Sequence, residues 1–80
     1  MNQQDKLKKH WQRKGYLVVN LIRITPIGLP DLLCAKPDHV VFVESKEKGD
    51  SLSALQKIWL RRLNKLGFDT YVNFDRIDHV

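Results

Sequence analysis

The sequence predicts an α/β domain in which two helices flank a mixed four-stranded sheet. Two segments carry apolar residues at spacings of three and four, as amphipathic helices do, and four shorter segments are rich in β-branched and aromatic residues, as strands are. Their order along the chain is helix, three strands, helix, strand. A strand, a helix and a strand in succession require a right-handed crossover, so the third and fourth strands should lie parallel.

The chain has the size and composition of one folded domain, which we place at residues 1–80. It has 80 residues, of which 42% are hydrophobic and 29% are charged, and this composition excludes a disordered chain. A domain of this size buries only about 60–65% of the surface that its unfolded chain exposes. We therefore expect help from a ligand, a metal or a partner chain, and self-association would supply it.

The N-terminal region should form a helix and then a strand. The helix begins at Asn2 or Asp5 and ends at Lys14, and Gly15 follows as its C-terminal stop. Residues 16–23 are apolar on both faces. This pattern predicts a central or well-covered strand rather than a solvated edge.

The middle of the chain predicts a loop followed by a β-hairpin. Two prolines and a glycine make residues 25–30 a loop. Residues 31–35 and 39–46 are typical of two strands. Residues 36–39 supply the turn between them, with Pro37 at its first inner position.

The C-terminal half predicts the second helix and the last strand. Ser51 or Ser53 is the N-cap of this helix, and Gly67 ends it. Its apolar stripe has helical spacing and comprises Leu52, Leu55, Trp59, Leu63 and Leu66. Residues 68–74 form the last strand, and residues 75–80 are a polar tail with some residual β pattern.

Charged residues at the end of an apolar strand are the most informative feature of the sequence. The strand at residues 39–46 ends in Glu44 and Lys46, which share one face because side chains alternate along a strand. A turn that is symmetric about residues 37 and 38 pairs residues whose numbers sum to 75, which places Asp31 opposite Glu44. A turn of odd length would separate the two carboxylates, so the pairing depends on the register.

Two opposed carboxylates and one lysine predict a divalent-metal site. Like charges that face each other destabilise a sheet unless a cation lies between them. Two carboxylates, a few waters and a phosphate oxygen are ligands that suit Mg²⁺ or Mn²⁺. The alternative is that Glu44 and Lys46 form a surface salt bridge while Asp31 caps a turn.

Further residues favour the metal site over the salt bridge. Gly28 and Pro30 fix Asp31 directly after a loop that a ligand can approach. Gln56 lies beside the apolar stripe of the second helix, from which its amide could reach the same pocket, and its alternative is a solvated helix glutamine.

The charge of the chain points to a phosphate partner. The net charge is +5, and basic stripes of this kind suit phosphate backbones, although they also keep small proteins soluble. The basic residues of the two predicted helices are Lys6, Lys8, Lys9, Arg13, Lys14, Lys57, Arg61, Arg62 and Lys65. A phosphate partner is what a Mg²⁺ site would act on, so the two features support each other.

Cysteine usage and hydropathy indicate an intracellular protein. The single Cys34 cannot form an internal disulfide, which favours a reducing compartment. The N-terminus has no apolar signal, and the longest apolar stretch, residues 16–22, is too short to span a bilayer. We expect a cytoplasmic location and no membrane association.

The motifs resemble those of a nuclease family. Asp31 followed by Glu44-Ser-Lys46 resembles the PD-(D/E)xK pattern of the restriction-endonuclease-like nucleases, whose core has the order αβββαβ. More narrowly, the chain resembles the virus-type replication-repair nuclease (VRR-NUC) domain from about Gly15 to Val72. The motifs that carry this resemblance are Gly28-Leu-Pro-Asp-Leu32, Val43-Glu-Ser-Lys46, Leu52-Ser-Ala-Leu-Gln56 and Trp59-Leu60.

The resemblance implies metal-dependent hydrolysis of DNA phosphodiester bonds. Asp31 and Glu44 would be the metal-binding carboxylates, and the backbone carbonyl of Ser45 would be a further ligand. Lys46 would orient or activate the attacking water and stabilise charge in the transition state, while Gln56 would support the site from the helix. Stand-alone members of this family resemble junction-directed or flap-directed endonucleases that work as homodimers.

The first helix departs from the family pattern. Family members often carry a glutamate there that points toward the site, whereas this chain has Asn2-Gln-Gln-Asp5. Either Asp5 or a glutamine substitutes for it or the position is dispensable, so we assign no site residue to this helix. His10, His39 and His79 lack the spacing of metal ligands and are expected to be surface or turn histidines.

The sequence thus predicts an endonuclease that uses Mg²⁺ or Mn²⁺ and cleaves branched DNA such as Holliday junctions or flaps. It would act as a homodimer in DNA repair or recombination, in a bacterial cell or a phage-infected host. One alternative is a non-catalytic basic module that binds nucleic acid and keeps the nuclease fold. A second alternative is a structural adaptor that docks through residues 75–80.

Overall fold

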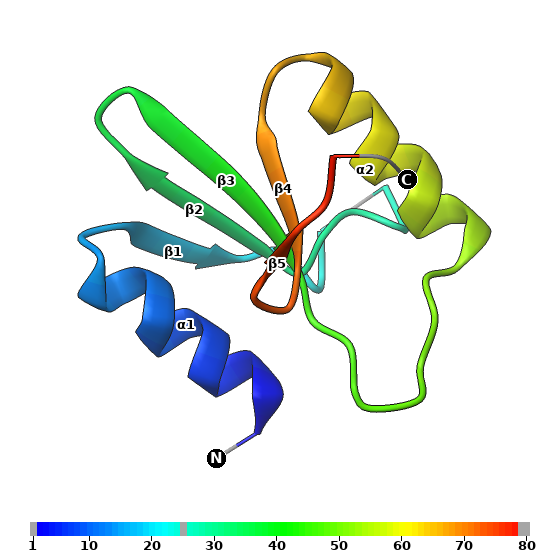
Figure 1. Cartoon of the computed structure of the whole chain (residues 1–80), viewed down its shortest axis with the longest axis horizontal. Helices are drawn as coiled ribbons and strands as arrows, with labels where there is room; N and C mark the ends of the chain where they lie inside the picture. The colour runs from blue at the N-terminus through cyan, green and yellow to red at the C-terminus, as the bar shows by residue number, and fades with distance from the viewer. Residues whose placement is uncertain (1, 25, 79–80) are drawn as a thin grey trace.

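The structure is a five-stranded mixed sheet with one helix on each face. The computed structural model describes residues 2–24 and 26–78. The strands lie in the order β1-β2-β3-β4-β5, so β3 is central (Figure 1). The elements are α1 (Gln3–Arg13), β1 (Leu17–Asn20), β2 (Leu32–Lys36), β3 (His39–Glu44), α2 (Ala54–Lys65), β4 (Asp69–Val72) and β5 (Asp75–Arg76).

α1 forms where the sequence predicted the first helix. Asn2 is its N-cap, and the Asn2 side chain accepts a hydrogen bond of 2.8 Å from the backbone N–H of Asp5. Leu7 and Trp11, one turn apart, are both buried. Gly15 follows the helix with a φ of 91°, a left-handed conformation that glycine adopts without a steric cost.

The β2–β3 hairpin has the predicted register. Ala35 pairs with Val40 and Leu32 pairs with Val43, so facing residue numbers sum to 75. Asp38 occupies the second position of the two-residue turn with a φ of 65°, which aspartate tolerates better than most residues. β3 and β4 are parallel, as the strand-helix-strand order required.

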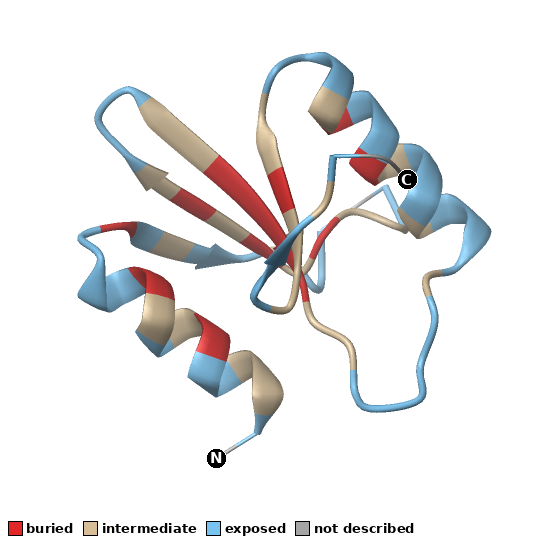
Figure 2. Cartoon of the chain, in the orientation of Figure 1, coloured by how far each residue is buried: buried red, intermediate tan, exposed pale blue. Residues whose placement is uncertain are grey.

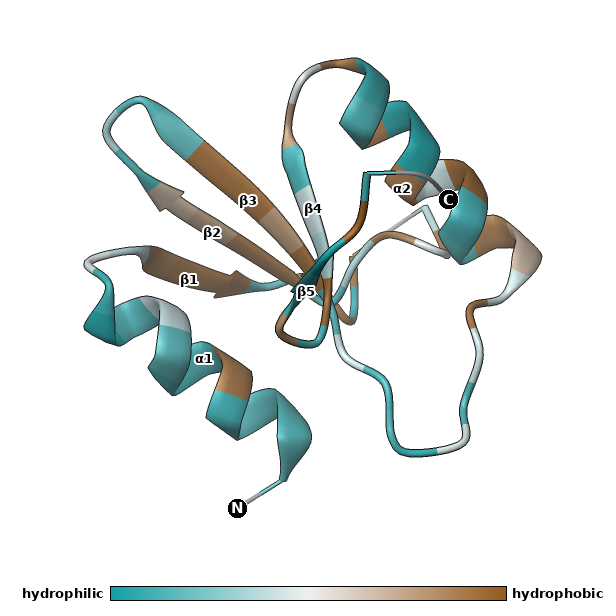
Figure 3. Ribbon diagram, viewed as in Figure 1, coloured by the Kyte–Doolittle hydropathy of each residue, from teal (hydrophilic) through white to brown (hydrophobic). Residues whose placement is uncertain are grey.

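β1 corrects the first strand prediction. It is a short edge strand that pairs only with β2, whereas the sequence predicted a central or well-covered strand. The side chains of Leu17 and Val19 are 69% and 38% exposed, and only Val18 between them packs against the core. Figure 3 shows β1 as apolar, whereas Figure 2 shows it as exposed or intermediate in burial. An apolar pattern on both faces does not distinguish a covered strand from an exposed apolar edge.

α2 begins at the second of the two predicted N-caps. Ser53 accepts a hydrogen bond from the Gln56 backbone N–H, and the Gln56 side chain accepts one from the Ser53 backbone N–H, which makes a capping box. The buried residues of α2 are Leu60 and Leu63, whereas Leu55 and Leu66 of the predicted stripe are exposed. The buried face is therefore rotated toward Gln56.

The C-terminal tail is part of the sheet, which has five strands instead of the predicted four. β5 pairs antiparallel with β4. The backbone N–H of Ile77 donates a hydrogen bond of 2.8 Å to the carbonyl of Thr70. Residues 75–78 are thus held in the fold and do not form a free docking segment. His79 of the same predicted tail lies outside the described residues.

The two helices cover opposite faces of the sheet. Val41 and Val43 of β3 belong to a buried cluster with Leu7 of α1. Side chains alternate along a strand, so Glu44 points to the other face, where it meets Gln56 of α2. No helix in the described parts of the chain is long and apolar enough to cross a membrane.

Candidate active site

The candidate site lies at the end of the central strand β3, where the predicted carboxylates come together. Glu44 is the last residue of β3, and its side chain is buried. Asp31 comes directly before β2, and continuation of the hairpin register places it opposite Glu44. The Asp31 carboxylate accepts a hydrogen bond of 3.0 Å from the backbone N–H of Ser45. The predicted juxtaposition of Asp31, Glu44 and Ser45 is therefore present.

The Glu44 carboxylate is only half satisfied. Its Oε2 accepts a hydrogen bond of 3.2 Å from the Gln56 side-chain amide. Its Oε1 has no hydrogen-bond partner, and the only other such buried side-chain atom in the described residues is Trp11 Nε1. Burial and the negative charge of Asp31 raise the pKa of Glu44 to about 8, against the lowering effect of Lys46. The surroundings of the Glu44 carboxylate would therefore accommodate a bound cation.

Lys46 joins the same group of side chains. Its Nζ lies 4.0 Å from Glu44 Oε2, and the Lys46 side chain is 18% exposed. Glu44 and Lys46 are two residues apart, and both point toward the face of the sheet that α2 covers. The ion pair of the predicted alternative is present, but it does not lie on the surface, because the Glu44 side chain is only 3% exposed.

The capping box of α2 orients Gln56 toward the site. Gln56 Oε1 accepts a hydrogen bond of 2.8 Å from the backbone N–H of Ser53, which fixes the orientation of the side-chain amide. Its Nε2 then donates to Glu44. Gln56 also precedes the buried Leu60 by one helical turn, so it lies on the inner face of α2 rather than beside it. The alternative of a solvated glutamine is therefore wrong.

The loop before Asp31 is pressed against α2. A Cβ atom at Gly28 would lie 2.9 Å from Leu55 Cβ and 3.0 Å from Trp59 Cδ1, and the φ of Gly28 is 99°. Only glycine satisfies both the close approach and the left-handed backbone. Pro30, directly before Asp31, is fully buried. The close approach at Gly28 brings the loop before Asp31 against the helix that carries Gln56.

Asn73 contacts the site residues and was missed by sequence reasoning. It is the first residue of the turn between β4 and β5, and its φ is 55°. Its backbone N–H donates to the Glu44 carbonyl at 2.8 Å. Its side chain accepts from the Lys46 N–H at 2.9 Å and donates to the Lys46 carbonyl at 3.0 Å. The signal that could have found it is an asparagine, which tolerates left-handed backbone, between two β-like segments.

The oxygen donors at the site suit a divalent cation. Asp31 and Glu44 supply carboxylates, and the Ser45 carbonyl lies between Glu44 and Lys46 in the chain. The described residues contain no group of three or more histidine, cysteine, aspartate or glutamate side chains that could hold a metal. Mg²⁺ commonly binds proteins through one or two carboxylates and takes its other ligands from water and phosphate. The unpartnered Glu44 Oε1 fits the same requirement.

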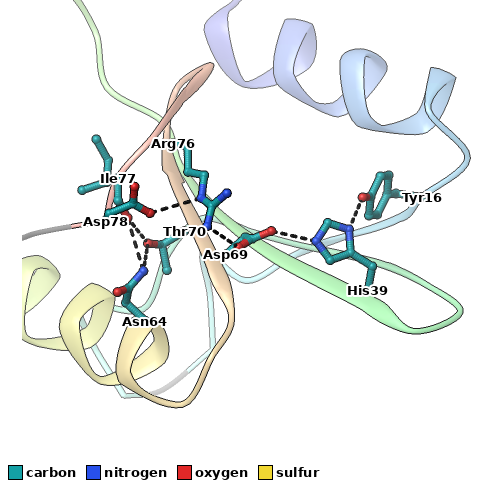
Figure 4. A network of polar contacts seen from close by, with 8 residues as sticks. All are labelled: Tyr16, His39, Asn64, Asp69, Thr70, Arg76, Ile77 and Asp78. Atoms are coloured by element: carbon teal, nitrogen blue, oxygen red, sulfur yellow. Dashed lines mark hydrogen bonds and ion pairs between the residues drawn. The ribbon is translucent and has the colours of Figure 1, made fainter.

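A second polar network on the sheet is held together by hydrogen bonds and ion pairs within the chain (Figure 4). In what we call the paired network, His39 hydrogen-bonds Tyr16 through Nδ1 and Asp69 through Nε2, and Asp69 also forms an ion pair with Arg76 at 3.3 Å. Buried Thr70 donates to the Ile77 carbonyl at 2.8 Å and accepts from the Asn64 side chain at 3.3 Å. The residues of this network come from β3, β4, β5 and α2 and from Tyr16, which directly precedes β1.

The predicted basic stripes are on the surface. The side chains of Lys57, Arg62 and Lys65 on α2 are exposed, and Arg62 lies 5.1 Å from the ring centre of Trp59. Asp5 on α1 is also exposed, and its backbone N–H is taken by the Asn2 cap. The prediction that the first helix contributes no site residue stays a prediction.

The fold and the grouping of two carboxylates with a lysine define the class of PD-(D/E)xK nucleases. The chain matches the VRR-NUC domain family over residues 4–73 and belongs to that family. A VRR-NUC domain implies a nuclease, which is a hydrolase with DNA as its substrate, and nucleases of this type generally use divalent metals. Comparison with curated proteins and with solved structures gave no significant match.

Proposed function

We propose that this protein is an endonuclease that hydrolyses DNA phosphodiester bonds with Mg²⁺ or Mn²⁺. Asp31, Glu44, Lys46 and Gln56 form the catalytic group, and Asp31, Glu44 and the Ser45 carbonyl hold the metal. The observation that carries the proposal is Glu44, which is buried, opposed by a second carboxylate and left with one unpartnered oxygen. Such an arrangement costs stability in a strand that is otherwise apolar, and a bound cation would offset that cost.

Each residue of the catalytic group has a role that follows from its contacts. When bound, the cation supplies charge neutralisation at the phosphate and lowers the pKa of water. Asp31 holds the Ser45 backbone, and Gln56 holds Glu44 in one rotamer. The Lys46 ammonium, which is partly buried and lies 4.0 Å from Glu44, stabilises negative charge that develops on the phosphate.

The substrate that we propose is branched DNA, such as a Holliday junction or a flapped duplex. The exposed basic residues of both helices suit contacts to phosphates, and phosphate contacts position a protein on DNA without reading its sequence. Selectivity would then come from the shape of the DNA. A role in repair or recombination follows from that substrate.

We further propose that the enzyme acts as a homodimer. The apolar edge at β1, with Leu17 and Val19 exposed, supports this assignment, because an unpaired edge strand is a template for pairing with another chain. Sedimentation analysis should give twice the mass of the chain. A monomer at the concentrations that support cleavage would contradict this part of the proposal.

The test of the enzymatic proposal uses matched pairs of variants. Glu44→Gln and Lys46→Ala should each lower cleavage of a branched DNA with Mg²⁺ by at least about 100-fold. Glu47→Gln and Lys48→Ala change exposed residues of the same loop and should cleave within about twofold of the wild type. Calorimetric titration with Mn²⁺ should show binding that Glu44→Gln weakens strongly.

Two outcomes would overturn the proposal. If Glu44→Gln and Lys46→Ala cleave as well as the wild type, the assigned residues are wrong. If the wild type binds DNA with strong salt dependence but neither cleaves it nor binds Mn²⁺, the chain is a non-catalytic nucleic-acid-binding module with a nuclease fold.

A further inference from the structure

The β3 strand ends before two of the residues assigned to the site. The last pair of the parallel ladder is Glu44 with Val72, so Ser45 and Lys46 have no strand partner. The chain after Glu44 contains no regular element until α2 begins at Ala54. Backbone without a ladder partner is usually the part of a fold that opens most readily. Something other than the sheet must hold these two residues.

The Asn73 side chain takes the place of the missing strand partner. Its amide is bonded to both backbone groups of Lys46, to the N–H at 2.9 Å and to the carbonyl at 3.0 Å. A side-chain amide has one donor and one acceptor side, so it can mimic the peptide group of a neighbouring strand. The backbone N–H of Asn73 also continues the ladder by donating to Glu44. Asn73 therefore extends β3 by two residues.

The two hydrogen bonds between the Asn73 side chain and the Lys46 backbone, which we call the clamp, determine the direction of the Ser45 carbonyl. The Ser45 carbonyl and the Lys46 N–H belong to one planar trans peptide, in which the two groups point in opposite directions. The Lys46 N–H points at Asn73, which follows β4, so the carbonyl points away from β4. β3 lies between β4 and β2 in the sheet, and Asp31 stands at the start of β2. The carbonyl is thereby turned toward the side of the sheet where Asp31 lies.

The clamp also fixes the starting point of the Lys46 side chain. Ser45 is held by Asp31 on one side, and Lys46 is held by Asn73 on the other. Lys46 Nζ reaches to 4.0 Å from Glu44 from this restrained backbone. The turn that carries Asn73 is itself restrained, because the next residue, Phe74, packs edge-on against His10 of α1 with ring centres 5.1 Å apart.

We propose that Asn73 is a positioning residue, which aims the Ser45 carbonyl and the Lys46 ammonium at the site through its two-point hydrogen bond to Lys46. This inference rests on the proposed nuclease function for its catalytic consequence. Its structural consequence, the restraint of the Lys46 backbone, is independent of that function.

The decisive variant is Asn73→Gly, because glycine keeps the left-handed turn and removes only the clamp. Asp38→Gly is the matched control, since Asp38 is the other non-glycine residue with a positive φ among those described, and it lies in the β2–β3 turn away from the site. The two variants change the same kind of backbone position. They differ in whether a contact to Lys46 is lost.

The first measurement is amide hydrogen exchange of Lys46 in metal-free protein. Asn73→Gly should speed exchange of this amide by at least about tenfold, and Asp38→Gly should leave it unchanged. The second is steady-state cleavage with Mg²⁺. Asn73→Gly should lower kcat by about 10- to 100-fold with KM changed less than about threefold, because a small displacement of an aligned group mainly affects the chemical step.

The outcomes separate this inference from the proposed function. If the Lys46 amide exchanges at the wild-type rate in Asn73→Gly, the clamp does not exist in solution. If exchange is faster but kcat equals that of Asp38→Gly, Asn73 supports the fold and does not position the site. A wild-type protein that fails to cleave DNA refutes the nuclease function, while the exchange measurement still decides whether the clamp restrains Lys46.

Discussion

Two polar clusters on one sheet are built in opposite ways. In the paired network, Asp69 and His39 have partners on both of their polar atoms. At the candidate site, Glu44 is more deeply buried than either, faces a second carboxylate and leaves one oxygen without a partner. Native proteins satisfy buried polar groups when those groups serve the fold. The site departs from this rule at Glu44, as the proposed metal site requires.

The candidate site also differs from the paired network in that rigid elements lie beside it. The conflict between Asp31 and Glu44 persists only because the surroundings prevent either from moving away. The Asp31 loop approaches α2 closely at Gly28, Pro30 is buried, and the capping box holds Gln56 against Glu44. The paired network needs no such support, because its own ion pair and hydrogen bonds hold it.

The largest expected effect comes from exchanging one aspartate in each cluster for asparagine. Asp31→Asn should lower cleavage by at least about 100-fold, because a carboxylate of the proposed metal site is lost. It should not reduce the free energy of unfolding of the metal-free protein, since an amide can still accept from the Ser45 N–H and the like charge beside Glu44 is gone. Cleavage assays and urea unfolding in EDTA measure the two effects.

Asp69→Asn should give the reverse result and serves as the control. It removes the charge that pairs with Arg76 and His39, which should cost about 1 kcal/mol of unfolding free energy at a partly exposed site. Cleavage should stay within about twofold of the wild type. If Asp69→Asn abolishes cleavage while Asp31→Asn does not, the functional assignment of the two clusters is reversed.

The next effect is a dependence of stability on pH in metal-free protein. The pKa of Glu44 is raised from 4.5 to about 8 in the folded chain. Between these values the folded state binds more protons than the unfolded state, so the free energy of unfolding falls as pH rises. The loss is complete above about pH 8, and the shift corresponds to an upper bound on the order of 5 kcal/mol.

Urea unfolding in EDTA from pH 5 to 8.5 tests this dependence. Glu44→Gln should flatten the profile, because glutamine does not titrate, and Glu47→Gln should keep the wild-type slope since Glu47 is exposed. Addition of Mn²⁺ at pH 8 should stabilise the wild type through binding to the folded state. A wild-type profile that is flat without metal would show that burial and Asp31 do not raise the pKa of Glu44.

The sequence allowed the pairing at the site to be predicted because that pairing depends on local rules. A two-residue turn at Pro37 and Asp38 determines the hairpin register, and the register places Asp31 opposite Glu44. Strand alternation then puts Lys46 on the same face. The helix caps at Asn2 and Ser53 follow from equally local chemistry.

The features that sequence reasoning missed depend on contacts between distant segments. The stripe of α2 was centred on leucines that prove exposed, such as Leu55 and Leu66, because spacing alone does not say which edge of a broad apolar face meets the sheet. Asn73 acts on Lys46 across 27 positions of the chain, through the parallel pairing of β3 and β4. The tail joins the sheet as β5 only because β4 offers it a free edge.

A smaller loss of stability than the pH effect of Glu44 is expected when one hydroxyl is removed from the network of Figure 4. Thr70 is fully buried, donates to the Ile77 carbonyl and accepts from Asn64. Thr70→Val keeps the shape of the side chain but removes both hydrogen bonds of the hydroxyl, so that Asn64 and the Ile77 carbonyl keep only their 3.3 Å bond to each other. This loss should cost about 1–2 kcal/mol of unfolding free energy. Thr70→Ser keeps the hydroxyl, so chemical unfolding should show a smaller loss that reflects the missing methyl group.

The two clusters should differ in the sign of the change in unfolding free energy when a buried polar group is removed. Removal of a polar group by Thr70→Val should destabilise the protein, whereas removal of a charge by Glu44→Gln should stabilise it in EDTA at pH 8, although Glu44 and Thr70 are both buried and lie on adjacent strands. The hydroxyl has its partners within the chain, while the carboxylate lacks one. If both substitutions destabilise the metal-free protein to the same extent, Glu44 is a structural residue, and its unpartnered oxygen is not a metal ligand.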